Sequence, residues 1–214
     1  MFTLLLSVAV AEEVTQEDLK GKGGSWLVEE SITINAPAEL VTPHLGDLTT
    51  WATWTNWTAE RDPECVWDYS GEGNTVGHTM HWDGPEMGEG WVELTSVTDG
   101  EIRYDLWFNK KKGTAGKGKF EISEADGVTT VVWSDVGKVG LFGRLFINKI
   151  EEMIGQDFLI GLENVKTTAE ATHTANVEEA ARLKAEVEAR LAEEAAKAAE
   201  AAKAAEGEGD EAVE

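Results

Sequence analysis

The sequence predicts an α+β fold in which one antiparallel sheet packs against a long helix. Runs of alternating apolar and polar residues recur about every ten residues, separated by Gly, Asp or Asn, which is typical of an antiparallel meander. After residue 141 the apolar residues recur at intervals of three and four, which is typical of an amphipathic helix. Because the meander has to bury its apolar face, we expect it to pack against this helix.

The folded part is expected to begin near Trp26, after a polar, glycine-rich linker at Val14 to Ser25. The stretch "WLVEESITINAP" alternates as a strand does, and it ends at Pro37. Proline suits the first turn of a helix, so a short helical region is predicted over "PAELVTPHLGDL".

Six further strands are predicted from period-two alternation. They are "CVWDYS", "NTVGHTMHWDG", "MGEGWVELTSV", "EIRYDLWFN", "GTAGKGKFEIS" and "GVTTVVWSDVG".

The long helix is predicted from one apolar stripe. Its members are Phe142, Phe146, Ile150, Met153, Ile154, Phe158, Gly161, Leu162, Val165 and Ala169.

Beyond Thr174 the composition shifts to Ala, Glu and Lys. Asn176 and Glu179 have the spacing of a capping box, which predicts the start of a separate, solvated helix. Favourable i,i+4 ion pairs are expected at Glu178/Arg182, Glu186/Arg190 and Glu193/Lys197. Residues 176–214 carry 12 acidic and 5 basic side chains, a net charge of −7 that leaves −16 on the rest. The predicted organisation is a leader and linker (1–25), a folded domain (26–172) and an acidic, helical or disordered tail (173–214).

The N-terminal segment Thr3 to Ala11, "TLLLSVAVA", is apolar and ends in an A-x-A triplet, as signal peptides do. It lacks a positively charged start and is short for such a peptide, so an ordinary apolar leader is the favoured alternative. Localisation is left open by the sequence, with the cytoplasm slightly favoured. No apolar run approaches the roughly 18 residues that span a bilayer.

The net charge is −23, from 41 acidic and 18 basic side chains. Such a surface repels a phosphate backbone, so no nucleic-acid partner is expected. The single cysteine, Cys65, excludes an intramolecular disulfide and is interpreted as a small, buried apolar residue.

Several strings together resemble one protein family. They are "SITINAPAELV", "GDLTTWATWTNW", "DPECVWDYSGEGNTVGHTMHWDG", "MGEGWVEL", "GVTTVVWS" and "MIGQDFLIGLENVK". From about Leu27 to Glu170 the chain resembles the polyketide cyclase/dehydrase-like proteins of the START-like superfamily, also called SRPBCC. The resemblance implies a helix-grip fold: a seven-stranded antiparallel sheet around a long C-terminal helix, with a deep apolar cavity between them. It implies no particular reaction, because the superfamily includes carriers, receptors and enzymes.

Metal, redox and nucleotide cofactors are not expected. His78 and His81 are three residues apart in a predicted strand, so they point to opposite faces of the sheet. His44 and His173 stand alone, and no metal-binding or nucleotide-binding motif accompanies any of the four histidines.

For acid–base chemistry the most suggestive residue is Tyr104, with His78 as a second candidate. Alternation places Tyr104 on one face with Ile102 and Leu106, and places Arg103 and Asp105 on the other. Tyr104 is thus either a hydrogen-bond donor to a ligand or a ring packed in the cavity wall, with Arg103 and Asp105 forming a solvated pair.

Nine tryptophans include four within the stretch "WATWTNWTAERDPECVW", and the aromatic and apolar residues of the predicted elements are candidates for a ligand-binding wall. The candidate ligand-binding residues are Trp54, Trp57, Met80, Trp82, Tyr104, Leu106, Phe108, Phe120, Trp133, Phe146, Met153 and Phe158. Gly161 is expected to leave room for a ligand. The alternative is that these side chains fill an ordinary core.

Three functions therefore remain open. The first is binding or transport of a small hydrophobic molecule of the lipid, isoprenoid or aromatic polyketide type. The second is a cyclase or dehydratase that acts on a hydrophobic substrate. The third is an adaptor that uses the C-terminal helix, whose stripe of Leu183, Val187 and Leu191 is short for a coiled coil. No protein partner is specified by the sequence.

Overall fold

The computed structural model describes residues 24–108, 116–139 and 143–210. The apolar leader, nearly all of the linker and Phe142 lie outside these residues. The described residues up to Glu170 form one compact unit, and those from Ala171 onward form a second.

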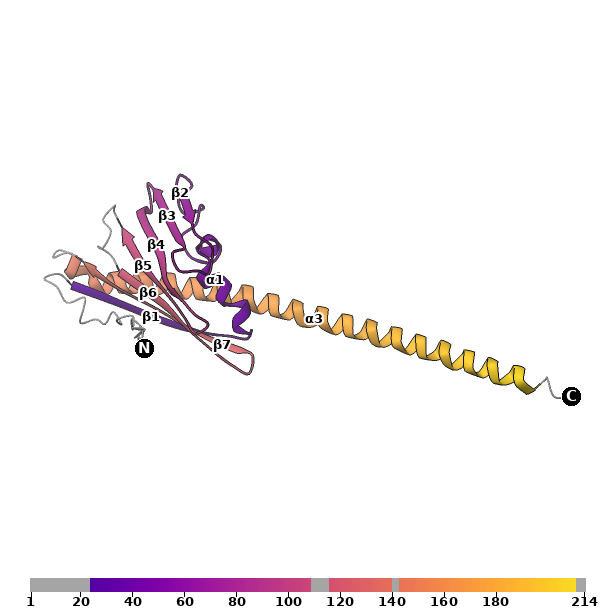
Figure 1. Cartoon of the computed structure of the whole chain (residues 1–214). Helices are drawn as coiled ribbons and strands as arrows, with labels where there is room; N and C mark the ends of the chain where they lie inside the picture. The colour runs from indigo at the N-terminus through magenta and orange to yellow at the C-terminus, as the bar shows by residue number, and fades with distance from the viewer. Residues whose placement is uncertain (1–23, 109–115, 140–142, 211–214) are drawn as a thin grey trace, which may run out of the picture. The chain divides into compact units, whose positions relative to one another are not determined.

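Seven strands form one antiparallel sheet in the order β1-β7-β6-β5-β4-β3-β2 (Figure 1). They are β1 (Gly24–Ile34), β2 (Val66–Ser70), β3 (Thr79–Gly84), β4 (Gly88–Val97), β5 (Glu101–Phe108), β6 (Gly116–Ala125) and β7 (Val128–Val139). Each strand lies on a segment that period-two alternation predicted, and β2 to β7 follow one another as a meander.

Turn chemistry explains where the strands end. Asp126 and Gly127, which join β6 to β7, both have positive φ values, as a two-residue hairpin turn with the right-handed twist requires. β3 begins at Thr79 and not near Asn74, because Gly71, Asn74 and Gly77 all have positive φ values that break the extended conformation.

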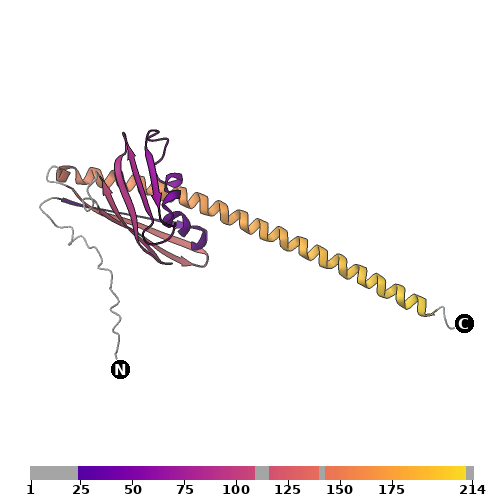
Figure 2. The same ribbon diagram turned by 45° about the horizontal axis from the view of Figure 1, so that its top comes forward.

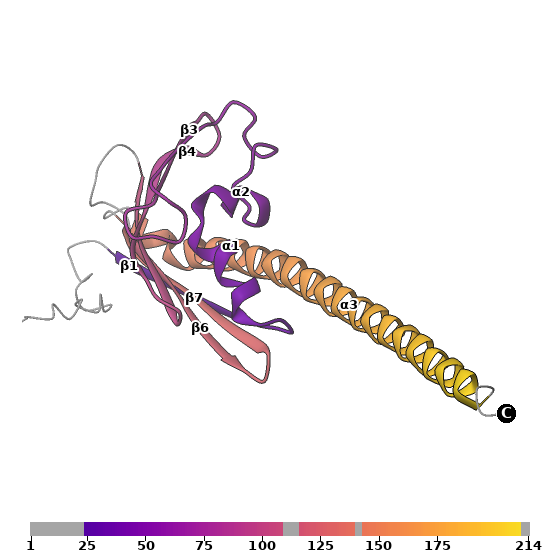
Figure 3. The ribbon, with the colours of Figure 1, turned by 45° about the vertical axis from the view of Figure 1, so that its right-hand side comes forward.

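Short helices follow β1, as the position of Pro37 predicted. They are η1 (Ala38–Leu40), α1 (Thr42–Gly46), η2 (Leu48–Thr50) and α2 (Trp51–Trp54). After β7 come η3 (Gly143–Phe146) and the long helix α3 (Ile147–Asp210). Figure 3 shows α1 and α2 on the same side of the sheet as the first part of α3.

The first part of α3 crosses one face of the sheet, as Figure 2 shows, and covers the apolar side of the strands. Two of its glutamates also accept hydrogen bonds from the backbone of the edge strand β1 and of the residue that follows it. Glu151 Oε1 accepts from Leu27 N at 3.0 Å, and Glu170 Oε1 accepts from Asn35 N at 2.8 Å. Nineteen helical residues span about 28.5 Å and eight strand residues span about 27 Å, so helix and strand nearly match in length along this edge. These bonds satisfy backbone donors that an edge strand would otherwise expose.

The capping-box prediction at Asn176 is wrong, because α3 is continuous from Ile147 to Asp210. No Gly or Pro interrupts the stretch around Asn176, and a break there would leave unpaired backbone groups at two new helix ends. Among the expected pairs, Glu193 and Lys197 are in contact at 2.6 Å. Arg182 pairs instead with Glu179, and Arg190 with Glu194. Leu183, Val187 and Leu191 are exposed. No helix in the described ranges is long and apolar enough to cross a membrane.

Candidate functional site

A cavity of about 80 Å³ lies between the sheet, α2 and the first part of α3. Its wall consists of Trp26, Trp51, Thr55, Asn56, Trp57, Val92, Tyr104, Leu106, Phe108, Trp133, Asp135, Ile154, Asp157 and Phe158. Tyr104, Asp135 and Val92 at the inner end are almost fully buried, whereas Phe108 at the other end is 36% exposed. The partly exposed end, which also includes Asn56, Trp57 and Asp157, is called the mouth below.

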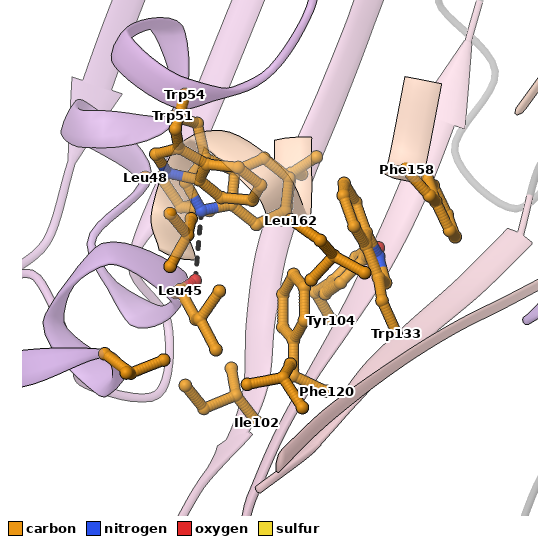
Figure 4. Packing of buried hydrophobic residues seen from close by; sticks show 14 of the residues in the cluster. Leu45, Leu48, Trp51, Trp54, Ile102, Tyr104, Phe120, Trp133, Phe158 and Leu162 are labelled. Atoms are coloured by element: carbon orange, nitrogen blue, oxygen red, sulfur yellow. Dashed lines mark hydrogen bonds between the residues drawn. The ribbon is translucent and has the colours of Figure 1, made fainter. Parts of the chain in front are cut away.

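The inner wall is built from packed aromatic rings, several of which are seen together in Figure 4. Trp133 and Phe158 stack at 3.7 Å between ring centroids, and Trp54 contacts Trp133 edge to face at 5.5 Å. Trp51 lies edge-on to Tyr104 at 5.3 Å. These rings fill most of the interior, so the cavity is what remains after the aromatic core has packed.

The two indoles of α2 are fixed by hydrogen bonds as well as by packing. Trp51 Nε1 donates to Leu45 O and Trp54 Nε1 donates to His44 O, both at 3.0 Å. Because these carbonyls end the short helix α1, the indoles satisfy backbone groups that the helix leaves unpaired. The tryptophan-rich segment therefore closes one side of the core and caps α1.

A chain of hydrogen bonds crosses the inner end of the cavity. Trp133 Nε1 donates to Tyr104 Oη at 2.6 Å, and Tyr104 Oη donates to Asp135 Oδ1 at 2.6 Å. All three residues are buried, and all three line the cavity. They form the principal polar feature of an otherwise aromatic and aliphatic inner wall.

The position of Tyr104 depends on Gly118. In the sheet register Tyr104 on β5 pairs with Gly118 on β6, which pairs with Asp135 on β7. A Cβ atom on Gly118 would overlap both Asp135 Oδ1 and the Tyr104 ring. The absence of a side chain thus allows Tyr104 to reach over the intervening strand. Gly90 under Trp82 and Gly137 under Trp26 repeat the same arrangement.

Burial controls the ionisation of this pair. Desolvation raises the pKa of Asp135 to about 8, although the hydrogen bond from Tyr104 and the nearby indole N–H of Trp133 oppose the rise. Burial, followed by the charge of Asp135, raises the pKa of Tyr104 well above its usual value. A carboxyl group with a pKa near 8 is mostly protonated at neutral pH and is able to donate a hydrogen bond.

Polar residues at the mouth are paired with one another. Asn56 Nδ2 donates to Asp157 Oδ1 at 2.8 Å, and Arg61 Nη1 lies 4.0 Å from Asp157 Oδ2. Trp57 packs against Trp82 with ring centroids 4.9 Å apart. These contacts tie the loop after α2 to α3 and to β3.

The same loop is anchored at a second point by Asp62, which is buried. Asp62 Oδ2 accepts from the backbone N–H groups of Glu86 and Met87, both at 2.9 Å. Its other oxygen, Oδ1, is buried without a hydrogen-bond partner in the described ranges. Cys65 nearby is half-buried, and burial together with the Asp62 charge raises the pKa of its thiol.

Six of the residues proposed from sequence line the cavity: Trp57, Tyr104, Leu106, Phe108, Trp133 and Phe158. Four others, Trp54, Met80, Trp82 and Phe120, are buried in the core without lining the cavity. The candidates therefore divide into two groups: some line the cavity, and others fill the core.

Phe146 and Met153 do not line the cavity, contrary to the sequence expectation, and they are 60% and 56% exposed. Met153 lies five residues before Phe158, which places it about 140° around α3 from that buried side chain, and Phe146 lies in η3, before α3 begins. Gly161 also differs from expectation. The space beside it is occupied by the Trp54 and Trp133 rings, so it allows close packing and leaves no room for a ligand.

Neither histidine of β3 and the turn before it lines the cavity. His78 is buried, with Leu48 N donating to its Nε2 at 3.0 Å and its Nδ1 2.9 Å from Ser70 O. His81 lies on the other face of the sheet, stacked on Trp91 at 3.9 Å. Arg103 and Asp105 do not pair with each other: Arg103 contacts Glu101, and Asp105 contacts Lys117. No cluster of potential metal ligands occurs in the described part of the chain.

Sequence reasoning missed eight residues of the cavity wall: Trp26, Trp51, Thr55, Asn56, Val92, Asp135, Ile154 and Asp157. A signal for Asp135 was present, because it follows Trp133 by two residues and therefore shares its face of the strand. Asp157 precedes Phe158 on α3, and only the rotation of the packed helix places both at the cavity.

The fold and the cavity define a helix-grip protein with an internal site of mainly apolar character. A profile of the family described as "Polyketide cyclase / dehydrase and lipid transport" matches residues 25–170, and the chain belongs to this family. A search of curated proteins found no match.

Solved structures share the fold at low identity. The di-domain ARO/CYC StfQ from the steffimycin biosynthetic pathway is 11% identical, with a TM-score of 0.56 over 73% of this chain and 54% of that one. A protein from Thermobifida fusca is 18% identical, with a TM-score of 0.51 over 65% and 90% of the two chains. A hypothetical protein from Helicobacter pylori is 10% identical, with a TM-score of 0.51 over 67% and 87%.

Proposed function

We propose that the protein binds a small hydrophobic molecule in the cavity between the sheet and α3. The observation that carries this proposal is the cavity itself: its inner wall is aromatic and aliphatic, with one concentrated group of polar atoms. Such a wall favours an apolar ligand, and a few placed polar groups fix its orientation. Family membership is consistent with this function.

The size of the cavity restricts what binds without rearrangement. About 80 Å³ is roughly half of an engineered cavity of ~150 Å³ that accommodates benzene in another protein. The end of a longer molecule fits this space, whereas a complete ring would require the wall to move, and the remainder of a longer ligand would pass through the mouth. Displacement of Trp57 from Trp82 would enlarge the opening, since Trp57 is only half-buried.

A cavity-filling substitution tests the proposal. Ile154 lines the cavity, whereas Ile150 lies one turn earlier on the same face of α3 and does not. Ile154→Phe should weaken binding of a one-ring probe such as ethylbenzene by tenfold or more in calorimetric titration. Ile150→Phe is the matched control and should leave binding unchanged. Equal affinities in both variants would contradict the location of the site.

Native mass spectrometry of the purified protein, before and after solvent extraction, would detect an endogenous ligand. A stoichiometric mass that disappears on extraction would support a carrier and would supply the compound for further tests. Trp26, Trp51, Trp57 and Trp133 line the cavity, so the same compound should change tryptophan fluorescence when it is added back.

Acid–base catalysis on a hydrophobic substrate is the second candidate, and one observation favours it. Asp135 is a cavity-lining carboxyl whose pKa is raised by burial to about 8, close to the pH at which a general acid or base is effective. His78 is not part of this candidate, because it does not line the cavity. If the pair acts in catalysis, Tyr104→Phe should reduce turnover of an identified ligand far more than its affinity. Small, equal effects on both would remove the enzymatic role.

A further inference from the structure

We propose that the cavity selects a neutral apolar molecule that carries one acceptor oxygen, such as a carbonyl group, and that Asp135 holds this oxygen by donating a hydrogen bond from its carboxyl group. This inference rests on the proposed function and names the chemistry of its ligand. It makes Asp135 the residue that distinguishes a ketone from both a hydrocarbon and a carboxylate.

The hydrogen bonds of Trp133 and Tyr104 are donated in one direction, toward Asp135. Trp133 N–H donates to Tyr104 Oη, so the Tyr104 hydroxyl proton is directed to Asp135 Oδ1. Neither Trp133 nor Tyr104 has a further polar hydrogen for a ligand. The donor that remains is the proton of the Asp135 carboxyl itself, because this carboxyl is the acceptor in its hydrogen bond from Tyr104 and toward the indole N–H of Trp133.

The surroundings of Asp135 are mainly apolar. Its strand neighbours are Val28 on β1 and Gly118 on β6, neither of which has a polar side chain. Tyr104 from β5 is the titratable group in contact with it, and Asp157 from α3 is the other titratable group on the cavity wall. Its buried position favours the neutral carboxylic acid, and the pKa of about 8 agrees with this geometry.

The charge of the cavity excludes an anionic ligand. The wall contains two carboxyl groups, those of Asp135 and Asp157, and no Lys, Arg or His is among the described residues that line it. The one guanidinium identified at the mouth, that of Arg61, lies against Asp157 and Asn56 O. A carboxylate ligand would enter a desolvated site without a counter-ion, in a protein of net charge −23.

Three one-ring probes of similar size test the proposal: ethylbenzene, acetophenone and benzoate. We expect acetophenone to bind the full-length protein about 3- to 10-fold more tightly than ethylbenzene at pH 6, as one added hydrogen bond predicts. Benzoate should bind at least tenfold more weakly than ethylbenzene. At pH 9.5, where Asp135 is ionised and has no proton to donate, the preference for acetophenone should disappear.

Two variants assign this behaviour to Asp135. Asp135→Asn keeps an acceptor for Tyr104 and presents an N–H donor at every pH, so its preference for acetophenone should persist at pH 9.5. Asp105→Asn makes the same chemical change on the opposite face of β5, where Asp105 contacts Lys117, and should behave as the unmodified protein does.

The outcomes separate this inference from the proposed function. Equal binding of ethylbenzene and acetophenone at pH 6, or tighter binding of benzoate, would overturn the role of Asp135 while ligand binding stands. A preference for acetophenone that persists at pH 9.5 without substitution would also overturn it. Failure of all three probes to bind would reject both the cavity function and its selectivity.

Discussion

Tyr104 and Asp135 are joined by a 2.6 Å hydrogen bond although they lie on strands β5 and β7, which do not pair with each other. The strand between them, β6, presents Gly118 at this level, and the phenol ring passes over the space that a side chain would occupy. One glycine therefore decides whether the polar group of the cavity exists.

Gly118→Ala should break this hydrogen bond, because the added methyl group would overlap both partners. The buried carboxyl and hydroxyl would then lose their partner, which costs about 1–3 kcal/mol for each unsatisfied group. Chemical denaturation measures the loss of stability. Gly100→Ala is the control, since its added Cβ has only ordinary contact with Ile122 O at 3.7 Å, and it should be neutral. Equal stabilities of the two variants would show that Tyr104 reaches Asp135 by another path.

The free energy of unfolding should depend on pH through Asp135. The carboxyl has a pKa of about 8 in the folded state and an ordinary value of 3.8 when unfolded. Between these values the folded state binds more protons than the unfolded state, so the contribution of Asp135 to stability falls as pH rises, by about 1.4 kcal/mol per pH unit. Below pH 3.8 and above pH 8 it becomes constant.

Asp135→Asn removes this titration. The stability of the variant relative to the unmodified protein should therefore increase steadily from pH 4 to pH 8, as measured by urea denaturation at a series of pH values. Asp105→Asn, on the exposed face, should show no comparable slope. A difference that does not change with pH would mean that the Asp135 carboxyl is ionised throughout this range.

Two glycines of α3 should respond in opposite ways to replacement by alanine. At Gly155 the nearest atom to an added Cβ is Glu30 Oε1 at 3.2 Å, the end of a flexible side chain, so better helix propensity should stabilise the protein by up to ~1 kcal/mol. At Gly161 the Cβ would lie 3.1 Å from the Trp54 ring and 3.2 Å from the Trp133 ring, which are fixed in the core. Overpacking of about 1–3 kcal/mol should dominate there. Thermal unfolding of both variants tests this, and a stabilised Gly161→Ala protein would show that the rings can move.

Asp62→Ala should loosen the loop that bears Trp57. The substitution leaves the backbone N–H groups of Glu86 and Met87 without their acceptor, at a cost of about 1–3 kcal/mol. We expect faster limited proteolysis between Thr55 and Cys65, and faster ligand association if this loop gates the mouth. Glu60→Ala changes an exposed acidic residue of the same loop and serves as the control. An unchanged proteolysis rate in Asp62→Ala would show that Asp62 does not hold this loop in place.

Local periodicity was sufficient for the architecture. Alternation identified all seven strands, and the three- and four-residue intervals identified the long helix. It also placed Tyr104 on the buried face and Arg103 on the other, because adjacent residues of a strand point to opposite sides. The resemblance to the polyketide cyclase/dehydrase-like family, carried by several such segments, was confirmed as well.

The composition of the cavity was decided by the tertiary structure. Phe146 and Met153 belong by spacing to the apolar stripe that the sequence predicts, yet Phe146 lies in η3, and the rotation of the packed helix α3 presents Ile154 and Phe158 to the sheet instead of Met153. The partnership of Tyr104 with Asp135 depends on the register of three strands and on the missing side chain of Gly118. The sequence by itself thus determined which residues face inward along each strand, since that property repeats within a few residues. Which of those residues meet around a cavity follows from strand register and helix rotation, which are set by the packing of the whole core.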